Sequence, residues 1–515
     1  MFVRIFSFLF PVSVLLAQTW NTYHGDNFNS GYAPGIGAIN SPTLRWSFNS
    51  GGRIWISTPV IGELDGDPNP EVVFGTFDSN RFYALNAEDG SVYWFYQVAG
   101  SNNFGTAVIG DVDADGQNEV VCPFNYADSI ICLEGDGTRK WGYLTSVWTQ
   151  APCKLADVDN DGKPEVITTD YWGYVYALNA ENGSQLWRVD KGTNAFAGPV
   201  ITPASINAGT TPDVIVASHG SGSLYALEGS TGAQIWANAS AGDPYYGSPT
   251  IANITPDASF EVIACNANNG IVYCLNVEDG SQNWRYPSSG SIGGSLYSTP
   301  AVADLNGDGD LEIVFGCGNG FVYALNPDGT LFWSRNLGAS ISYSSAAICD
   351  IDGDTRPEVL IGTAGNRLYC LNGEDGTILW NYLTGNQITS SPVPVDADGD
   401  GNLGVLIGSH DYNMYLIDIS PTYDGSKEEG VSGGQWLVVT PGSGGMLVRF
   451  ALTESSPVSL DLYDISGALV CSASLGQLDA GEHSRFVATA RSGVLFLVLT
   501  TPGGSRTATC VIPGR

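Results

Sequence analysis

The sequence predicts an all-β chain: an eight-bladed β-propeller closed by an N-terminal strand, followed by a small C-terminal β-sandwich. Three observations support this prediction. A segment of about 48 residues recurs along most of the 515-residue chain, and this period lies in the range of propeller blades. Short runs of β-branched and aromatic residues alternate with Gly, Asp and Asn. No segment shows a convincing helical period.

The first 17 residues have the features of a signal peptide. Arg4 supplies a positive charge, residues 5–16 are apolar, and Ala17 is a small residue at the expected cleavage position. The apolar run is too short to span a membrane, and no later stretch is long enough to do so. We therefore expect an exported protein, secreted or held at the cell surface, with no transmembrane segment.

One complete repeat runs from Ser57 to Tyr96, with strands expected over residues 58–62, 71–75, 82–86 and 92–96. A tryptophan in the last strand recurs at steps of 46–49 residues. Large aromatic side chains at one repeated position are expected to pack between neighbouring blades. The recurring residues are Trp94, Trp141, Trp187, Trp236, Trp284, Trp333 and Trp380.

The eighth repeat, residues 389–419, lacks the strand that carries the tryptophan. Trp46 lies one repeat length before Trp94, within the apolar segment 44–48. We expect this N-terminal segment to complete the last blade. Such a closure joins the two ends of the ring and protects its edges.

The repeats resemble two related propeller families. Residues 84–90 followed by Trp94 resemble the tryptophan-docking repeat of pyrroloquinoline-quinone-like (PQQ-like) propellers, as do residues 176–187 and 225–236. Acidic loops in the same repeats resemble the FG-GAP repeats of integrin-α-like propellers. Together the resemblances cover roughly residues 20–420, and we expect the propeller domain to span residues 18–420. They indicate the fold and leave the function open.

The acidic loops link the first and second strands of the repeats. In residues 157–165, carboxylates stand at positions 1, 3, 5 and 9, and Gly162 permits a tight bend. Alternating oxygen ligands suit Ca²⁺, whereas crowded carboxylates repel one another without a cation. Five loops keep the pattern, which predicts about five structural calcium sites. The expected ligands are Glu63, Asp65, Asp67, Glu71, Asp111, Asp113, Asp115, Glu119, Asp157, Asp159, Asp161, Glu165, Asp304, Asn306, Asp308, Glu312, Asp350, Asp352, Asp354 and Glu358.

Three other repeats depart from this pattern. We expect a weak or lost site in the eighth, little binding in the fifth, and no site in the fourth. The residues concerned are Asp396, Asp398 and Asp400 with Gly404 in the eighth repeat, Asn253, Thr255, Asp257 and Glu261 in the fifth, and residues 203–213 in the fourth.

Aromatic residues recur just before the inner strand of the repeats. Propeller geometry would gather them around one mouth of the central channel, where their faces could stack sugars or hold a peptide. Packing between blades is the alternative. The residues are Phe104, Phe196, Tyr246, Tyr297 and Tyr343, with Trp55 and Trp148 nearby.

Catalytic motifs are not evident in the sequence. The four histidines form no zinc motif, and the letters GxSxG at residues 430–434 lie in a Gly-rich linker without the strand–turn–helix context of a nucleophile. The PQQ-like resemblance implies an alcohol or sugar dehydrogenase. The alcohol dehydrogenases of that family typically carry adjacent cysteines near the cofactor, however, and this chain has no such pair and no clear cationic cluster for the quinone carboxylates. A polysaccharide lyase would need a base and a charge-neutralising site that the sequence does not offer.

These observations favour a secreted, calcium-binding propeller without enzymatic activity that binds a glycan, a protein or a matrix. A structural surface scaffold is one alternative, and a quinone-dependent dehydrogenase or a polysaccharide lyase is another. The formal net charge of −33 argues against nucleic acid and anionic membranes as partners. We also expect a monomer.

Cys265 and Cys274 flank Asn269-Gly270, a strong signal for a two-residue hairpin turn. Counting outward from that turn places the two cysteines opposite each other. Cys122 and Cys132 lie similarly around a longer loop. Cross-strand disulfides, which export permits, and small buried side chains are the two alternatives.

After a linker at residues 421–434, the segment 435–515 has the alternation of a separate β domain. It resembles the type IX secretion sorting domain, an Ig-like sandwich read by an outer-membrane translocon. Residues 505–510 replace the usual lysine-rich final strand. A cleaved sorting signal and a retained sandwich therefore both remain open, and the translocon is an expected partner.

Overall fold

The computed structural model divides the chain into two compact units, Met1–Ile419 and Ser420–Arg515. The predicted signal peptide and linker lie outside the described residues. Those described are 20–418, apart from 68, 99–104, 126–128, 193–196, 208, 240–244, 256–258 and 269, and 436–512, apart from 443–444, 453–454, 465–468, 479–480, 489–492 and 503. No helix capable of crossing a membrane occurs among them.

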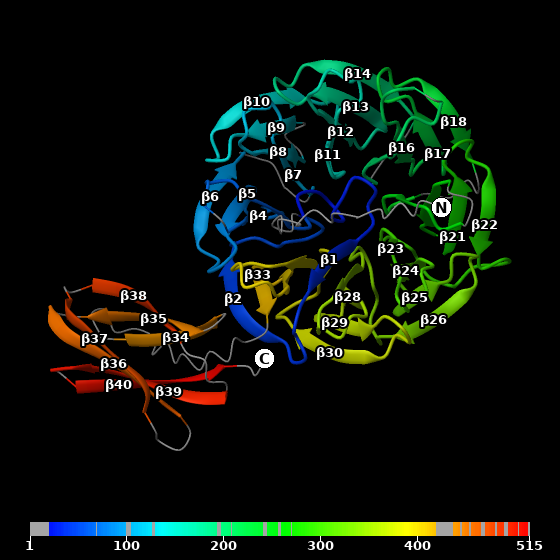
Figure 1. Cartoon of the computed structure of the whole chain (residues 1–515). Coiled ribbons are helices and arrows are strands. Elements are labelled where there is room, and N and C mark those ends of the chain that lie inside the picture. Colours follow the sequence, from blue (N-terminus) through cyan, green and yellow to red (C-terminus); the bar gives the residue numbers. More distant parts are fainter. Residues whose placement is uncertain are drawn as a thin grey trace, which may run out of the picture. The chain divides into compact units, whose positions relative to one another are not determined.

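The first unit is a propeller, as predicted: its described strands form eight sheets around a common centre (Figure 1). Blade 1 consists of β3 (Val60–Gly62), β4 (Glu71–Thr76), β5 (Arg81–Asn86) and β6 (Val92–Gln97), paired in sequence order. The short first strand is fully buried, and the last strand alternates between buried and exposed residues. Each blade therefore runs from a buried inner strand to an amphipathic outer strand.

Five further blades follow the same plan. Blade 2 is β7 (Val108–Gly110), β8 (Glu119–Phe124), β9 (Ser129–Leu133) and β10 (Arg139–Leu144); blade 3 is β11 (Lys154–Ala156), β12 (Glu165–Thr169), β13 (Tyr174–Asn179) and β14 (Gln185–Asp190); blade 4 is β15 (Val200–Ile201), β16 (Val214–Ala217), β17 (Leu224–Leu227) and β18 (Gln234–Asn238); blade 5 is β19 (Thr250–Ala252), β20 (Glu261–Asn266), β21 (Ile271–Asn276) and β22 (Gln282–Tyr286); and blade 6 is β23 (Ala301–Ala303), β24 (Glu312–Gly316), β25 (Phe321–Leu325) and β26 (Leu331–Asn336).

The N-terminal segment completes the last two blades. Blade 8 contains β31 (Val393–Val395), β32 (Gly404–Gly408) and β33 (Asn413–Asp418), and β2 (Thr43–Asn49) pairs antiparallel with β33 as its outer strand. This is the closure that the position of Trp46 predicts. Blade 7 contains β27 (Ala347–Asp350), β28 (Glu358–Gly362), β29 (Arg367–Asn372) and β30 (Ile378–Leu383), and β1 (Tyr32–Ile36) runs parallel to its inner strand.

The repeated tryptophans dock each blade onto the next. Trp333, for example, donates its indole N–H to the carbonyl of Gly373 at 2.7 Å. Gly376 lies against the same ring with φ +68°, and a Cβ there would come within 2.6 Å of the indole. Glycine is therefore required for both backbone conformation and space. The seven other docking donors are Trp46, Trp94, Trp141, Trp187, Trp236, Trp284 and Trp380.

Residues 20–39 cross the centre of the ring (Figure 1) and hydrogen-bond to the inner region of every blade. The contacts pair Trp20 with Ile61, Asn21 with Ile109, Asn27 with Leu155 and Ile201, Phe28 with Ile251, Ser30 with Val302, Gly31 with Ile348, and Ile36 with Leu403. The inner edge of a blade carries backbone groups that need partners. This segment supplies them, an arrangement that the repeat pattern did not predict.

The cysteine pairing inferred from the hairpin was wrong. In the observed register Cys265 lies opposite Val272, and Cys274 lies opposite Ile263. Both thiols are free and buried, as are those of Cys122 and Cys132. The β20–β21 hairpin closes at Asn266 and Ile271, so its turn holds four residues instead of two and shifts the register. The small-buried-residue alternative applies to all four cysteines.

The second unit contains two antiparallel sheets. One consists of β34 (Trp436–Gly442), β35 (Gly445–Leu452) and β38 (Gly481–Ala488). The other is β37 (Leu469–Leu478), β36 (Ser456–Asp464), β39 (Gly493–Thr501) and β40 (Gly504–Ile512), in spatial order. Buried apolar residues of β35, β36 and β39 form a single cluster, so the sheets pack face to face.

Candidate functional sites at the two ends of the inner strands

In blades 1, 2, 3, 6 and 7 the inner strand has two chemically different ends. In blade 1, Ile56 and Thr58 precede β3 and line a pocket, whereas Glu63 follows β3 and begins an acidic loop. We number these loops by their blades: loop 1 is residues 63–71, loop 2 is 111–119, loop 3 is 157–165, loop 6 is 304–312, loop 7 is 350–358 and loop 8 is 396–404.

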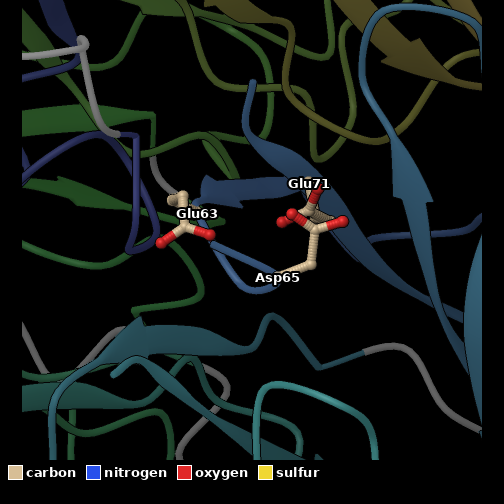
Figure 2. Close-up of side chains that lie close together, drawn as sticks. All are labelled: Glu63, Asp65 and Glu71. Carbon is tan, nitrogen blue, oxygen red and sulfur yellow. The ribbon is translucent and has the colours of Figure 1, made fainter. Parts of the chain in front are cut away.

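Loop 1 brings three of its predicted ligands together. Glu63, Asp65 and Glu71 each offer an oxygen, and these oxygens lie within 4.8 Å of one another (Figure 2). Gly66 turns the backbone with φ +89°, and the N–H of Asp67 donates to Oδ1 of Asp65 at 3.0 Å. Three convergent carboxylates on a short loop provide the hard oxygen ligands that Ca²⁺ takes in proteins.

Loops 3 and 7 repeat this arrangement, whereas the other acidic loops differ. The close groups are Asp157, Asp159 and Glu165 in loop 3, and Asp350, Asp352 and Glu358 in loop 7. In loops 2 and 8 the close groups contain aspartates alone: Asp111, Asp113 and Asp115, and Asp396, Asp398 and Asp400. Asn306 occupies the third position of loop 6, and no close group of three acids forms there among the described residues. Asp257 of the fifth repeat lies outside the described residues.

In every blade with an acid at the ninth loop position, that acid accepts a hydrogen bond from the backbone N–H of the second loop residue. Oε2 of Glu71 accepts a hydrogen bond from the N–H of Leu64 at 2.6 Å. Blades 4 and 5, which lack the full acidic pattern, retain the same contact through Asp213 and Glu261. The contact therefore ties the loop to the second strand independently of any cation. It recurs in Glu119, Glu165, Glu312 and Glu358.

Burial raises the pKa of Glu71 and of Glu358 to about 8. Neighbouring carboxylates of the same loop raise the pKa further, and the backbone N–H that each glutamate accepts opposes the rise. Burial likewise raises the pKa of Glu165 to about 7. A cation that binds these carboxyls near neutral pH therefore competes with protons.

At the other end of the inner strands, three of the predicted aromatic residues form a row. The ring centroids of Tyr246 and Tyr297 are 4.7 Å apart, and those of Tyr297 and Tyr343 are 5.2 Å apart with the rings stacked. All three are partly exposed and line an open pocket. Phe104 and Phe196 lie outside the described residues.

Trp55 and Trp148 pack against other aromatic rings and are not among the residues that line the pocket. The Trp55 ring lies 5.1 Å from that of Phe77, and the Trp148 ring lies 5.0 Å from that of Tyr171. For these two residues the packing alternative applies.

The N-terminal segment provides part of the pocket. Tyr23 lines it, and its hydroxyl hydrogen-bonds to Thr299 and Ser345 at 3.0 Å each. The repeat pattern gave no signal for this residue, because Tyr23 precedes the first repeat. Its long-range hydrogen bonds anchor the segment in the ring.

No charged side chain is among the described residues that line the pocket. Its polar groups are neutral hydroxyls and one amide: Tyr23, Thr58, Thr106, Gln150, Ser248 and the three tyrosines of the row. The buried Lys154 donates instead to the backbone carbonyl oxygens of Tyr23, at 2.7 Å, and of Asp26, and burial lowers its pKa to about 7. Such a pocket suits an uncharged ligand that carries hydroxyl groups and apolar faces.

The repeats match a known family over part of the propeller. The family model described as "Outer membrane protein assembly factor BamB", built on PQQ-like repeats, matches residues 172–356 and 318–400. The propeller carries PQQ-like repeats. This supports the resemblance drawn from the tryptophan-docking segments.

Proteins similar to this propeller include dehydrogenases. A polyvinylalcohol dehydrogenase from Pseudomonas sp. is 24% identical over 376 residues, which cover 64% of this chain and 52% of that protein. The chain thus spans about half the length of that curated relative. A europium-containing methanol dehydrogenase superposes with a TM-score of 0.61 at 12% identity, covering 78% of this chain and 98% of that one. A quinohemoprotein alcohol dehydrogenase from Comamonas testosteroni superposes with a TM-score of 0.58 at 14% identity, covering 82% of this chain and 83% of that one.

The expectation that the chain is not an enzyme was wrong. It rested on missing adjacent cysteines and a missing cationic cluster, whereas several of the similar proteins that cover the propeller are dehydrogenases, alongside a BamB from Moraxella catarrhalis. Missing features of one type of active site do not exclude catalysis, because one fold carries different sites.

Proposed function

We propose that this chain is an alcohol dehydrogenase of the quinoprotein type that takes an uncharged, hydroxyl-rich substrate at the aromatic pocket. The observation that carries the proposal is the similarity to a polyvinylalcohol dehydrogenase over 376 residues. Polyvinyl alcohol is a neutral chain of hydroxyl-bearing carbons, and the described pocket lining is neutral as well. Because the lining carries no charge, no charged group is left without a partner when such a chain displaces water from the pocket.

The pocket offers two kinds of contact to such a substrate. The faces of Tyr297 and Tyr343 provide apolar surface for carbon-bound hydrogens. Thr58, Thr106 and Gln150 provide hydrogen-bonding groups for hydroxyls. Apolar surface with a few convergent polar groups is the usual composition of a small-molecule site.

A quinone cofactor supplies the two-electron acceptor that alcohol oxidation requires. Only one of Tyr246 and Tyr297 can stack on its flat ring, because the planes of the two rings are tilted by 60°, and its carbonyl oxygens would compete with the substrate hydroxyls for the donors of Thr106 and Gln150. Its acid groups would meet only neutral donors among the described lining residues. We therefore expect the quinone to bind weakly and to be needed in excess.

The proposal is tested by titrating the mature protein with pyrroloquinoline quinone in the presence of Ca²⁺. The absorbance of the quinone should shift on binding. Dye-linked oxidation of polyvinyl alcohol and of a short diol should then follow. Absence of oxidation at saturating quinone, dye and substrate would refute the assignment.

We propose, second, that acidic loops bind Ca²⁺ as structural sites. Convergent carboxylates in loops 1, 3 and 7 support this, and so do the raised pKa values of their buried glutamates. Each ion would join the turn after the inner strand to the start of the second strand. Calcium sites of extracellular modules typically have Kd values of ~10⁻⁴–10⁻³ M.

We propose, third, that the second unit directs export of the chain through a secretion translocon. Its two packed sheets are consistent with the resemblance to a sorting sandwich. The test compares the full chain with a chain that ends at residue 419 when both are expressed in a bacterium with type IX secretion. Equal amounts of the two proteins in the medium would refute this role.

A further inference from the structure

The residue that precedes each docking tryptophan differs among the blades. It is cationic in two of them, Arg45 in blade 8 and Lys140 in blade 2. In the other six blades it is uncharged. The six uncharged residues are Tyr93, Leu186, Ile235, Asn283, Phe332 and Leu379.

Lys140 reaches into the acidic loop of its own blade. Its Nζ lies 2.7 Å from Oδ2 of Asp113, the third loop residue, and 3.6 Å from Oε1 of Glu119, the ninth. Glu134 is a third partner at 3.1 Å. The lysine side chain is only 15% exposed. The ammonium group therefore stands among the carboxylates that would otherwise face a metal ion.

Arg45 makes the equivalent contacts in blade 8, although it comes from the opposite end of the chain. Its Nη1 lies 2.6 Å from Oδ2 of Asp398, again the third loop residue. It lies 3.0 Å from Oδ2 of Asp418, which is buried. Gly404 stands at the ninth position, and a Cβ there would come within 3.3 Å of the Asp418 carboxyl carbon. Asp418 thus takes the space of the missing ninth acid.

The second partner of each cation also differs from the residue at that position in blades 1, 3 and 7. Glu134 and Asp418 follow or end the third strand. At the corresponding positions of blades 1, 3 and 7 the residue is Asn86, Asn179 or Asn372, each paired in register with the ninth loop acid. A cation before the tryptophan and an acid at the end of the third strand therefore occur together only in blades 2 and 8.

Loops 1, 3 and 7 have no such internal cation among the described ion pairs. Lys163 of loop 3 pairs with Glu181, outside the loop. In loop 7, Glu358 is fully buried, and its Oε1 has no hydrogen-bond partner. A buried carboxylate oxygen without a partner is costly. Glu358 belongs to the group of three carboxylates that converge in loop 7, so a cation is the natural partner of this oxygen.

We infer that Lys140 and Arg45 are built-in counter-ions that replace the divalent ion in loops 2 and 8. Calcium then binds the loops without an internal cation, including loops 1, 3 and 7. This inference rests on the proposed calcium binding and corrects the expectation that loop 2 is a calcium site. Among the blades with an acidic loop, a cation before the docking tryptophan together with an acid at the end of the third strand then marks the blades that do not depend on metal.

The test measures how many Ca²⁺ ions the full chain binds, by native mass spectrometry and by calorimetric titration. Lys140→Met removes the ammonium and should add one bound Ca²⁺ relative to the wild type. The melting temperature of this variant should also become more sensitive to EDTA. Lys163→Met removes a lysine of loop 3 whose ammonium group pairs with Glu181 outside the loop, and it should leave the number unchanged.

The reverse change transplants the counter-ion into blade 3. Leu186→Lys combined with Asn179→Glu places a cation and an acid at the positions of Lys140 and Glu134, and should remove one bound Ca²⁺. This variant decides the question if Lys140→Met does not fold.

The outcomes separate this inference from the proposal on which it rests. A wild-type protein that binds no Ca²⁺ refutes calcium binding itself. If the wild-type protein binds Ca²⁺ but neither Lys140→Met nor the Leu186→Lys, Asn179→Glu double variant changes the number of bound ions, only the counter-ion inference is overturned.

Discussion

The two ends of the inner strands are a few residues apart in the sequence but differ in chemistry. In blade 1, Thr58 lines a pocket without charged groups among its described residues, and Glu63 begins a loop of carboxylates. The same inner strand positions both ends in blades 1, 2, 3, 6 and 7. The comparison shows that the repeat determines the positions of the side chains at the strand ends, whereas the identity of a few residues at each end determines which ligand that end suits. The pocket suits a neutral substrate because the charge is kept at the other end.

The largest expected effect is at the pocket. Replacing Tyr297 and Tyr343 together with alanine removes the stacked pair. We expect kcat/KM for polyvinyl alcohol to fall roughly 10- to 100-fold, as when two aromatic contacts of about 0.5–1.5 kcal/mol each are lost. The effect of Ca²⁺ on the melting temperature should not change. The matched control is Trp172→Ala, an exposed aromatic residue that does not line the pocket. Equal activity of the double variant and the control would contradict the assignment of the pocket.

The next effect comes from metal removal. Ca²⁺ at about ten times its Kd contributes roughly 1.4 kcal/mol per site through binding to the folded state alone. Several such sites should raise the melting temperature by at least about 5 °C. The measurement is a thermal melt in 10 mM Ca²⁺ and in EDTA, with Mg²⁺ as the control ion. Coincident melting curves would exclude structural calcium.

A smaller effect concerns pH. In the metal-free protein the pKa of Glu71 and of Glu358 is about 8, above the ordinary value of about 4.3 in an unfolded chain. The folded state then binds these protons more tightly, so the contribution of these two groups to stability is fully present below pH ~4.3 and is lost as pH rises toward about 8. Melts in EDTA between pH 5 and 8 should show this decline, and Ca²⁺ should reduce it. The Glu71→Gln, Glu358→Gln double variant should show a smaller decline.

The smallest effect tests the docking of the blades. Trp333→Phe keeps an aromatic ring but loses the hydrogen bond to Gly373. We expect a loss of about 1–2 kcal/mol in the free energy of unfolding, measured by denaturant titration. Trp172→Phe, at an exposed position, should change stability by less than about 0.5 kcal/mol. Equal stability of the two variants would mean that the indole hydrogen bond contributes nothing.

The sequence predicts the features that recur. The tryptophan period predicts the blades, and Trp46, one period before Trp94, predicts that β2 closes the ring. The spacing of the acids predicts the convergence seen in loops 1, 3 and 7. These predictions succeed because a repeated side-chain pattern reports a repeated environment.

Features that occur once were missed. Residues 20–39 contact the blades mainly through backbone hydrogen bonds, which carry no side-chain pattern. The role of Lys140 had a detectable signal, a cation directly before a docking tryptophan, but its meaning depends on the distance to Asp113 in the folded chain. The hairpin of Cys265 was misjudged because Asn-Gly suggested a tighter turn than the four residues observed.

A crystal structure of the mature protein soaked with Ca²⁺ and a short neutral polyol tests the central claim most directly. That claim is the division between a neutral pocket and cation-binding loops. The polyol should lie on Tyr297 and Tyr343, with ions in loops 1, 3 and 7 and Lys140 and Arg45 in place in loops 2 and 8. A polyol bound elsewhere, or loops 1, 3 and 7 without ions at millimolar Ca²⁺, would contradict the account.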